Sequence, residues 1–151
     1  MFIVFDLDFT LWDCGGTWCD CTSPPYYKQN GMIRDSGGKI ITLYPDVYPI
    51  LKKLKHRQVS MAVASRTTTP DWADELMRLF DIKKYFDYFE IYPASKLNHF
   101  KSLQHKTKIP FDNMVFFDDE ERNIKEVGML GVDTVFVGNG INMKLIEPYL
   151  D

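Results

Sequence analysis

The residues best suited to chemistry stand at the start of the chain, in the segment MFIVFDLDFTLW. Residues 2–5 form a short apolar run of β-strand type that is followed directly by Asp6. A second carboxylate comes at Asp8 and a hydroxyl at Thr10. An apolar run of this kind, ended by polar residues, is typical of a strand buried on both faces. Two acids just beyond such a strand can bind a hard cation, and one of them can also act as a nucleophile.

Further polar side chains follow three later apolar runs. They are Ser65 and Arg66 after the second run, Lys96 after the third, and Asp118 and Asp119 after the fourth. Because the carboxyl ends of parallel strands meet at one edge of a sheet, we expect these groups to converge with the first two acids. The acids suit a divalent cation, whereas the hydroxyl, the ammonium and the guanidinium suit an anion. Both kinds together predict a metal-bridged phosphate, which is what phosphoryl transfer requires.

The elements that must position these groups alternate along the chain. Strands are expected over residues 2–5, 59–64, 88–92, 114–117 and 134–137. Helices are expected over residues 45–56, 69–80, 98–105 and 122–130, with a short one after Asn142. This alternation predicts an α/β fold in which a Rossmann-like parallel sheet carries helices on both faces.

Between the first strand and the first helix lies an irregular segment rich in glycine and proline, the residues typical of turns and loops. Near its end, residues 32–34 and 39–43 flank a glycine-bearing turn, so a β-hairpin is expected there. We interpret residues of about 13–43 as a small β-hairpin flap after the first strand rather than as a second domain.

Composition and charge are those of an ordinary globular protein. The 151 residues are 45% hydrophobic and carry a formal net charge of −3, with a sequence pI of about 5.6. This balance gives no electrostatic reason to expect nucleic acid or an anionic membrane as the main partner. No apolar run approaches the ~18 residues of a membrane span, and no basic leader precedes the first strand. We therefore expect a soluble cytoplasmic protein and a monomer.

Three cysteines, Cys14, Cys19 and Cys21, fall in one short stretch of the flap. Together with nearby acids they could hold zinc, but a structural zinc site normally has four ligands in paired short spacings. The simpler interpretation is a loop with reduced thiols or one opportunistic disulfide.

These segments resemble a known family. DLDFTLW matches the D-x-D-x-T motif of the haloacid dehalogenase superfamily of phosphotransferases. Ser65, Lys96 and the pair Asp118 and Asp119 look like its second, third and fourth motifs, in the expected order. The stretches ASRT, IYP-x-SK, HKT-x-x-P and MVFFDDE-x-RN are similar to segments of the small magnesium-dependent phosphatases of eukaryotes, across nearly the whole chain.

The resemblance implies a role for each acid. Asp6 would attack phosphorus to form an aspartyl-phosphate and would also bind Mg2+. Asp8 would protonate the leaving oxygen and then deprotonate water, while its backbone carbonyl bound the metal. Of the remaining pair, Asp119 is favoured as the direct metal ligand and Asp118 as an indirect or water-mediated one, although the sequence leaves their order open.

Other residues would hold the substrate. By the same resemblance, Ser65 and Lys96 would bind phosphate oxygens, and Thr10 would fix the turn after the first strand. Leu7, between the two acids, is grouped with these phosphate-binding residues. Arg66 suits a carboxylate or phosphate of the substrate because its planar guanidinium donates in a fork.

Members of this superfamily often carry a cap domain, but the segments between the motifs of this chain are too short for one. We therefore expect one capless domain over residues 1–151, with an open site covered at most by the flap. Trp18 in the flap could line the mouth of this site or pack within the loop. The resemblance implies activity toward phosphotyrosine and toward phosphorylated sugars or sugar–amine adducts. The partner would then be a phosphorylated small molecule or a phosphoprotein.

Plainer explanations exist for each residue taken alone. Acids end strands and cap helices, and Ser65 or Lys96 could stand at a strand end or at a solvated helix start. A catalytically retired relative that binds a phosphorylated ligand or a carrier protein is the alternative function, and a cysteine-based redox or zinc module is a third. His99 and His105 are expected on the polar face of a helix, and Trp12 in packing.

Overall fold

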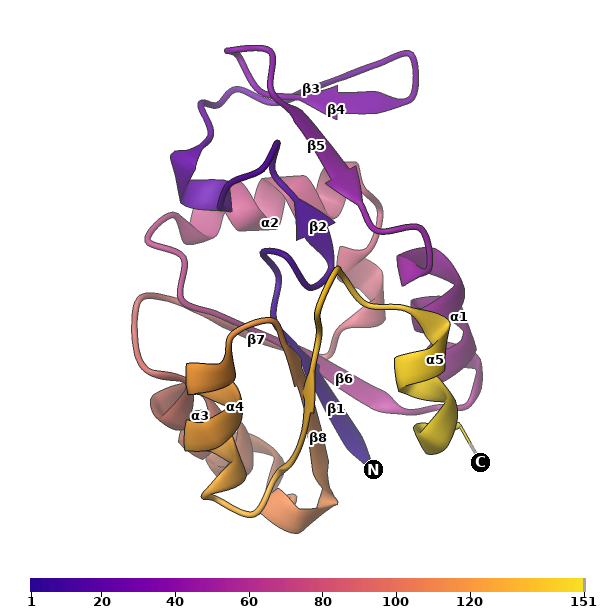
Figure 1. Cartoon of the computed structure of the whole chain (residues 1–151), viewed down its shortest axis with the longest axis vertical. Helices are drawn as coiled ribbons and strands as arrows, with labels where there is room; N and C mark the ends of the chain where they lie inside the picture. Colours follow the sequence, from indigo (N-terminus) through magenta and orange to yellow (C-terminus); the bar gives the residue numbers. More distant parts are fainter. Residues whose placement is uncertain (151) are drawn as a thin grey trace.

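The computed structural model describes residues 1–150 and is built on a five-stranded parallel sheet in the order β7-β6-β1-β8-β9 (Figure 1). Its strands are β1 (Phe2–Phe5), β6 (Ser60–Ser65), β7 (Tyr88–Ile91), β8 (Met114–Asp118) and β9 (Asp133–Phe136). The helices are α1 (Val47–His56), α2 (Pro70–Leu79), α3 (Lys96–Thr107), α4 (Glu121–Gly128) and α5 (Met143–Ile146). Short 3-10 helices are η1 (Cys19–Cys21), η2 (Lys83–Tyr85), η3 (Phe111–Asn113) and η4 (Glu147–Tyr149). The predicted fold class is confirmed, and the boundaries of these five strands and of α1 to α4 lie within two residues of those expected.

Alternate residues of β1 face opposite sides of the sheet and build two separate cores. Ile3 and Phe5 belong to one hydrophobic cluster, whereas Phe2 and Val4 belong to the other. The first cluster contains the buried faces of α1, α2 and α5, and the second contains those of α3 and α4. Figure 1 shows α1 and α5 on one side of the sheet and α3 and α4 on the other. β1 is therefore buried on both faces, as its unbroken apolar run predicts.

The register of the sheet brings the carboxyl ends of its central strands to one edge. Phe5, the last residue of β1, pairs with Val63 of β6 and with Phe117 of β8. The chain runs from β1 through β6 to β7 on one side, and then crosses to β8 on the other side of β1. A reversal of strand order leaves a crevice beyond the strand ends, which is where open α/β sheets bind ligands. Side chains that follow β1, β6 and β8 are thus collected at one place.

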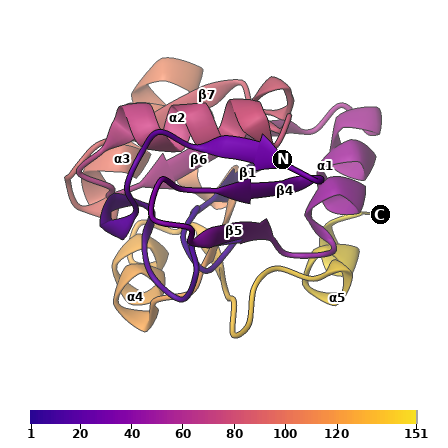
Figure 2. The same ribbon diagram turned by 90° about the horizontal axis from the view of Figure 1, so that it is seen from above.

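The flap is a second sheet of four antiparallel strands in the order β2-β5-β4-β3. Its strands are β2 (Trp12–Asp13), β3 (Tyr27–Gln29), β4 (Met32–Arg34) and β5 (Ile40–Leu43). The predicted hairpin corresponds to β4 and β5, but a two-stranded flap is an incomplete description. β3 is exposed along its whole length and β2 has only two residues, so neither gives the alternating pattern of a half-buried strand. Figures 1 and 2 show this sheet beyond the carboxyl end of β1.

No element larger than this flap is inserted between the strands of residues 1–150, so the chain lacks a large cap, as expected. In the same part of the chain, every helix is too short or too polar to cross a bilayer. The assignment of residues 1–151 to one domain stays a prediction.

Gly140, in the loop after β9, packs against Tyr44 in the segment that follows the flap, and a substitution can test this contact. Its φ is +79°, a left-handed backbone conformation, and a Cβ at this position would overlap the ring of Tyr44. We expect Gly140→Ala to lower the free energy of unfolding by about 1–3 kcal/mol, measured by urea denaturation. Gly138→Ala is the matched control, because a Cβ there meets no atom within 4 Å. Equal stability of the two variants would contradict this packing.

Candidate active site

Asp6 is the first residue beyond β1, and its position is fixed from two sides. Its backbone N–H donates to the carbonyl of Phe117 in β8 at 3.0 Å. Its carboxylate accepts from the ammonium of Lys96 at 3.0 Å and from the hydroxyl of Thr10 at 3.4 Å. The strand register and an ion pair therefore hold this carboxylate at the edge of the sheet.

Lys96 is the central cation of the site. It is the first residue of α3, and only 1% of its side chain is exposed. Its ammonium donates to Asp6 and to the carbonyl of Ala64, and it lies 3.5 Å from Asp118. A buried ammonium needs such partners to offset its lost hydration. The alternative of a solvated helix start for Lys96 is therefore wrong.

Three carboxylates, from Asp6, Asp118 and Asp119, meet beside this ammonium. One oxygen of each lies within 4.8 Å of the others. Burial, together with repulsion from Asp6, raises the pKa of both Asp118 and Asp119. One ammonium cannot balance three carboxylates, so the ionised group carries excess negative charge. A set of hard oxygen ligands with uncompensated charge fits a divalent cation such as Mg2+.

The two neighbouring acids differ in their contacts. Asp118 is fully buried, and its Oδ1 accepts from the backbone N–H of Glu120 at 2.7 Å. Its Oδ2 accepts from the side-chain amide of Asn123 at 3.1 Å. Asp119 is only partly buried and lines the cavity in front of the cluster. Asp119 is thus the member of the pair that faces the open side of the site.

Asp8 lies on the flap side of the site. Burial raises the pKa of Asp8 to about 6, with repulsion from Asp6 adding to the rise. Two donors oppose it: the indole N–H of Trp12 at 2.8 Å and the backbone N–H of Cys19 at 2.9 Å. A carboxyl group with a pKa near neutrality can both give and take a proton.

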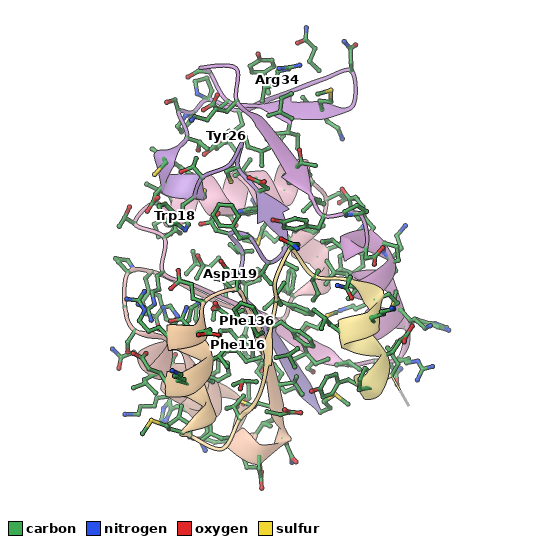
Figure 3. The ribbon with its side chains drawn as sticks, in the orientation of Figure 1. Trp18, Tyr26, Arg34, Phe116, Asp119 and Phe136 are labelled. Atoms are coloured by element: carbon green, nitrogen blue, oxygen red, sulfur yellow. The ribbon has the colours of Figure 1, made fainter. Side chains whose placement is uncertain are left out.

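A polar cavity of about 220 Å³ joins these groups. Figure 3 shows Trp18 on the flap side of it and Asp119 on the side of the sheet. Trp18 is 52% exposed and packs edge-on against Phe9, so its ring stands at the mouth. The predicted residues that line the cavity are Asp6, Asp8, Arg66, Lys96 and Asp119. The remaining lining residues are Trp18, Asp20, Thr67, Glu120, Arg122 and Asn123.

Three of the predicted substrate-binding residues lie behind the cavity wall. Leu7, Thr10 and Ser65 are all buried. The Leu7 carbonyl accepts the backbone N–H groups of residues 10–12, which closes the turn after β1. The Ser65 hydroxyl accepts from the backbone N–H of Thr67 at 3.3 Å. These contacts shape the loops that follow β1 and β6.

Arg66 follows β6 and reaches across to α4. Its Nη2 donates to the side-chain oxygen of Asn123 and lies 3.7 Å from the carboxylate of Glu126. Asn123 in turn donates to Asp118, so one amide ties the guanidinium to the acid pair. The buried Nε of Arg66 has no hydrogen-bond partner within residues 1–150. A donor is therefore left over beside the cavity.

Two contributions to the site were missed by reasoning from sequence. Asn123 bridges Arg66 and Asp118, and its only signal is its place in the stretch MVFFDDE-x-RN. Trp12 packs in the core, as expected, with a fully buried side chain. It also donates to Asp8, which no pattern in the sequence indicates.

The expectation of a polar helix face holds for one histidine and fails for the other. His105 is exposed. His99 is fully buried, with Nε2 at 3.0 Å from the carbonyl of Tyr92, and burial lowers its pKa to about 4. His99 therefore supports the loop between β7 and α3, so the prediction of a polar-face residue is wrong.

Comparison with known proteins identifies relatives among the phosphatases and hydrolases. A family model described as Acid Phosphatase matches residues 1–151. Magnesium-dependent phosphatase 1 of Homo sapiens is 46% identical over 150 residues, which cover 98% of this chain and 84% of that protein. A HAD-like hydrolase superfamily protein of Schizosaccharomyces pombe is 38% identical over 143 residues, covering 86% of this chain and 81% of its own length.

A solved structure shares the fold. A HAD-superfamily hydrolase from Ehrlichia chaffeensis superposes with a TM-score of 0.70 at 13% identity, over 98% of this chain and 94% of that one. The predicted resemblance is thereby confirmed by a family model, by relatives and by fold. The chain belongs to the acid phosphatase family, within the haloacid dehalogenase superfamily of hydrolases.

Proposed function

We propose that this chain is a Mg2+-dependent phosphomonoesterase that works through an aspartyl-phosphate intermediate. Its family is one of phosphatases, and its human relative is named for magnesium dependence. The observation that carries the proposal is the grouping around one cavity of three kinds of group. These are a carboxylate paired with a buried ammonium, an acid with a pKa of about 6, and a cluster of acids that one ammonium cannot neutralise.

Asp6 is the proposed nucleophile. One of its carboxylate oxygens attacks phosphorus, and the bond from phosphorus to the leaving oxygen breaks with its electron pair. Asp8 gives its proton to that leaving oxygen and later takes a proton from the water that attacks the aspartyl-phosphate. Cleavage of the bond between phosphorus and Asp6 then restores the carboxylate and releases inorganic phosphate.

The proposed metal ligands are the side chains of Asp6 and Asp119 and the backbone carbonyl of Asp8, with Asp118 contributing indirectly. The cavity-facing position of Asp119 supports this order, since both oxygens of Asp118 already accept hydrogen bonds. When bound, Mg2+ supplies the positive charge that offsets repulsion between these carboxylates and a phosphate.

Phosphate oxygens are held, in this proposal, by positive and neutral donors on the opposite side. The Lys96 ammonium lies against Asp6, and the guanidinium of Arg66 adds positive charge to the cavity wall. Ser65 is the proposed hydroxyl partner, while Thr10 fixes the turn after β1 and donates to Asp6. Leu7 completes the set through its place in the turn that follows β1.

For the substrate we propose phosphotyrosine or a phosphorylated sugar or sugar–amine, taken from a phosphoprotein or a small molecule. The exposed ring of Trp18 at the mouth suits stacking against a phenol or the apolar face of a sugar. Asp20 and Arg122 also line the cavity and offer charges of opposite sign to polar groups of the leaving group.

We also propose a cytoplasmic location, which the three free cysteines support because thiols persist in reducing compartments. The monomeric state and the absence of a nucleic-acid partner stay predictions.

The alternative of a retired phospho-ligand-binding or carrier-binding relative is not favoured. Such a module would not need Asp8, Asp118 and Asp119 in place together around the cavity. A zinc module is also not favoured. Within residues 1–150, the group of closely spaced metal-ligating atoms is formed by carboxylates and includes no cysteine.

Removing the nucleophile tests the reaction. We expect Asp6→Asn to lower kcat on p-nitrophenyl phosphate by at least about 10³-fold, because the amide keeps the shape but cannot attack. Chelation of the wild type by EDTA should also abolish activity. The matched control is Asp112→Asn, which changes an exposed acid in η3 and should stay within about twofold of wild type. Full activity of Asp6→Asn would show that Asp6 is not the nucleophile and would contradict the proposed covalent mechanism.

The acid cluster makes stability depend on pH and metal. The raised pKa values of Asp118 and Asp119 mean that, above the ordinary carboxyl pKa of about 4, the folded state binds more protons than the unfolded state. Stability of the metal-free protein should therefore contain a contribution that falls as pH rises from about 4 toward neutrality. Added Mg2+ should raise Tm at neutral pH, because it binds the folded state.

The test compares Tm of wild type and Asp119→Asn by scanning calorimetry near pH 5 and near pH 7.5, with and without Mg2+. The variant should lose less stability on going to neutral pH and should gain little from Mg2+. Asp112→Asn should behave as wild type. If Mg2+ raised the Tm of Asp119→Asn as much as that of wild type, Asp119 would not be a metal ligand.

A substitution of Asp20 can distinguish the two proposed substrate classes, because only a sugar–amine phosphate carries an ammonium that Asp20 could bind. If the substrate is a sugar–amine phosphate, Asp20→Asn should raise KM about tenfold by removing the partner of the ammonium, and should leave KM for phosphotyrosine within about twofold. Trp18→Ala should raise KM for both substrates, because stacking does not depend on charge. Initial-rate kinetics with both substrates decide the question, and equal effects of Asp20→Asn on the two would exclude a role in amine recognition.

A further inference from the structure

The two oxygens of the Asp8 carboxylate have unequal surroundings. Oδ1 accepts from the indole N–H of Trp12 at 2.8 Å and from the backbone N–H of Cys19 at 2.9 Å. The thiol of Cys14 is a weaker third donor to the same oxygen at 3.7 Å. All the hydrogen bonds that this side chain receives from residues 1–150 reach Oδ1.

This asymmetry determines where a proton can sit. The indole N–H and the backbone N–H can only donate. A proton on Oδ1 would therefore take up a lone pair that one of these donors needs, and a hydrogen bond would be lost. A proton on Oδ2 leaves both hydrogen bonds intact. The reactive oxygen of Asp8 is therefore Oδ2, the one that the flap leaves free.

We propose that Trp12 is a positioning residue for this reaction, which together with the Cys19 amide fixes the Asp8 carboxyl so that Oδ2 delivers the proton to the leaving group. This proposal rests on the proposed phosphatase function. Trp12 is fully buried and does not line the cavity, so it acts through Asp8 and not on the substrate.

The contacts of Trp12 fix the position of its indole ring. Its ring packs on Phe80 with centroids 6.2 Å apart. Its backbone pairs with Leu43 in the flap sheet, and its carbonyl accepts from the N–H of Phe9 at 2.7 Å. Side chain and main chain are thus both anchored, which gives the N–H a fixed direction toward Asp8.

The role predicts a dependence on the leaving group that a purely structural role would not produce. An alkoxide leaves poorly unless it is protonated as the bond breaks, whereas p-nitrophenolate leaves readily without a proton. Loss of the alignment of Asp8 should therefore slow cleavage of alkyl phosphates much more than cleavage of p-nitrophenyl phosphate.

The experiment measures kcat/KM with saturating Mg2+ for p-nitrophenyl phosphate and for glycerol 2-phosphate. We expect Trp12→Phe to lose about tenfold or more on the alkyl phosphate and less than about threefold on the aryl phosphate, as is usual for groups that orient a reacting residue. Asp8→Asn should show the same pattern with larger losses. Trp72→Phe is the matched control, a partly buried tryptophan of α2 in the same hydrophobic cluster, and should leave the ratio unchanged.

If Trp12→Phe unfolds, as judged by circular dichroism, the indole is replaced by its benzothienyl analogue, in which sulfur takes the place of N–H and the shape is kept. Equal losses on both substrates, or no loss on the alkyl phosphate, would overturn the role of Trp12 and leave the phosphatase function standing. A wild-type protein that hydrolyses neither substrate would overturn both.

Discussion

The ion pair between the Lys96 ammonium and the Asp6 carboxylate is the interaction on which the rest of the site depends. Both side chains are withdrawn from solvent, so loss of the Lys96 ammonium would leave the Asp6 carboxylate without its ion-pair partner in the interior, at a typical cost of about 3–5 kcal/mol. The partners are 90 residues apart in sequence and come from the end of β1 and the start of α3. The pair can therefore form only when the central strands and α3 are already assembled, and catalysis is tied to complete folding.

The same pair anchors a network of polar contacts along the edge of the sheet. From Lys96 it passes to Asp118, from there through the Asn123 amide to Arg66, and so joins the ends of β1, β6 and β8. Each link satisfies a buried polar group, which keeps the network rigid. The acids around the cavity outnumber the cations. The Lys96 ammonium and the Arg66 guanidinium nevertheless provide positive charge that suits an anion. The proposed cation and the phosphate of the substrate would thus each be bound better in the presence of the other.

Much of this arrangement was predictable because it follows from chain order. The apolar runs of β1 and β8 indicate buried strands, and acids placed directly after them must meet at the sheet edge. The flap strands left weaker traces, since β3 is exposed and β2 has only two residues. The contact between Trp12 and Asp8 depends on a turn in which Phe9 adopts φ +62°, a conformation that its residue type does not indicate. His99 lies at helical spacing from Phe100 and Leu103, so the helical period places it on the buried face of α3, but its polar residue type pointed to the exposed face.

One stretch of the flap has two duties. Trp18 meets whatever enters the cavity, and its neighbour Cys19 holds the acid with its backbone amide. A ligand that displaced this stretch would also remove a hydrogen bond from Asp8, the proposed proton donor. Under the proposed mechanism, a substrate that displaces this stretch would therefore be rejected through slow turnover as well as through weak affinity.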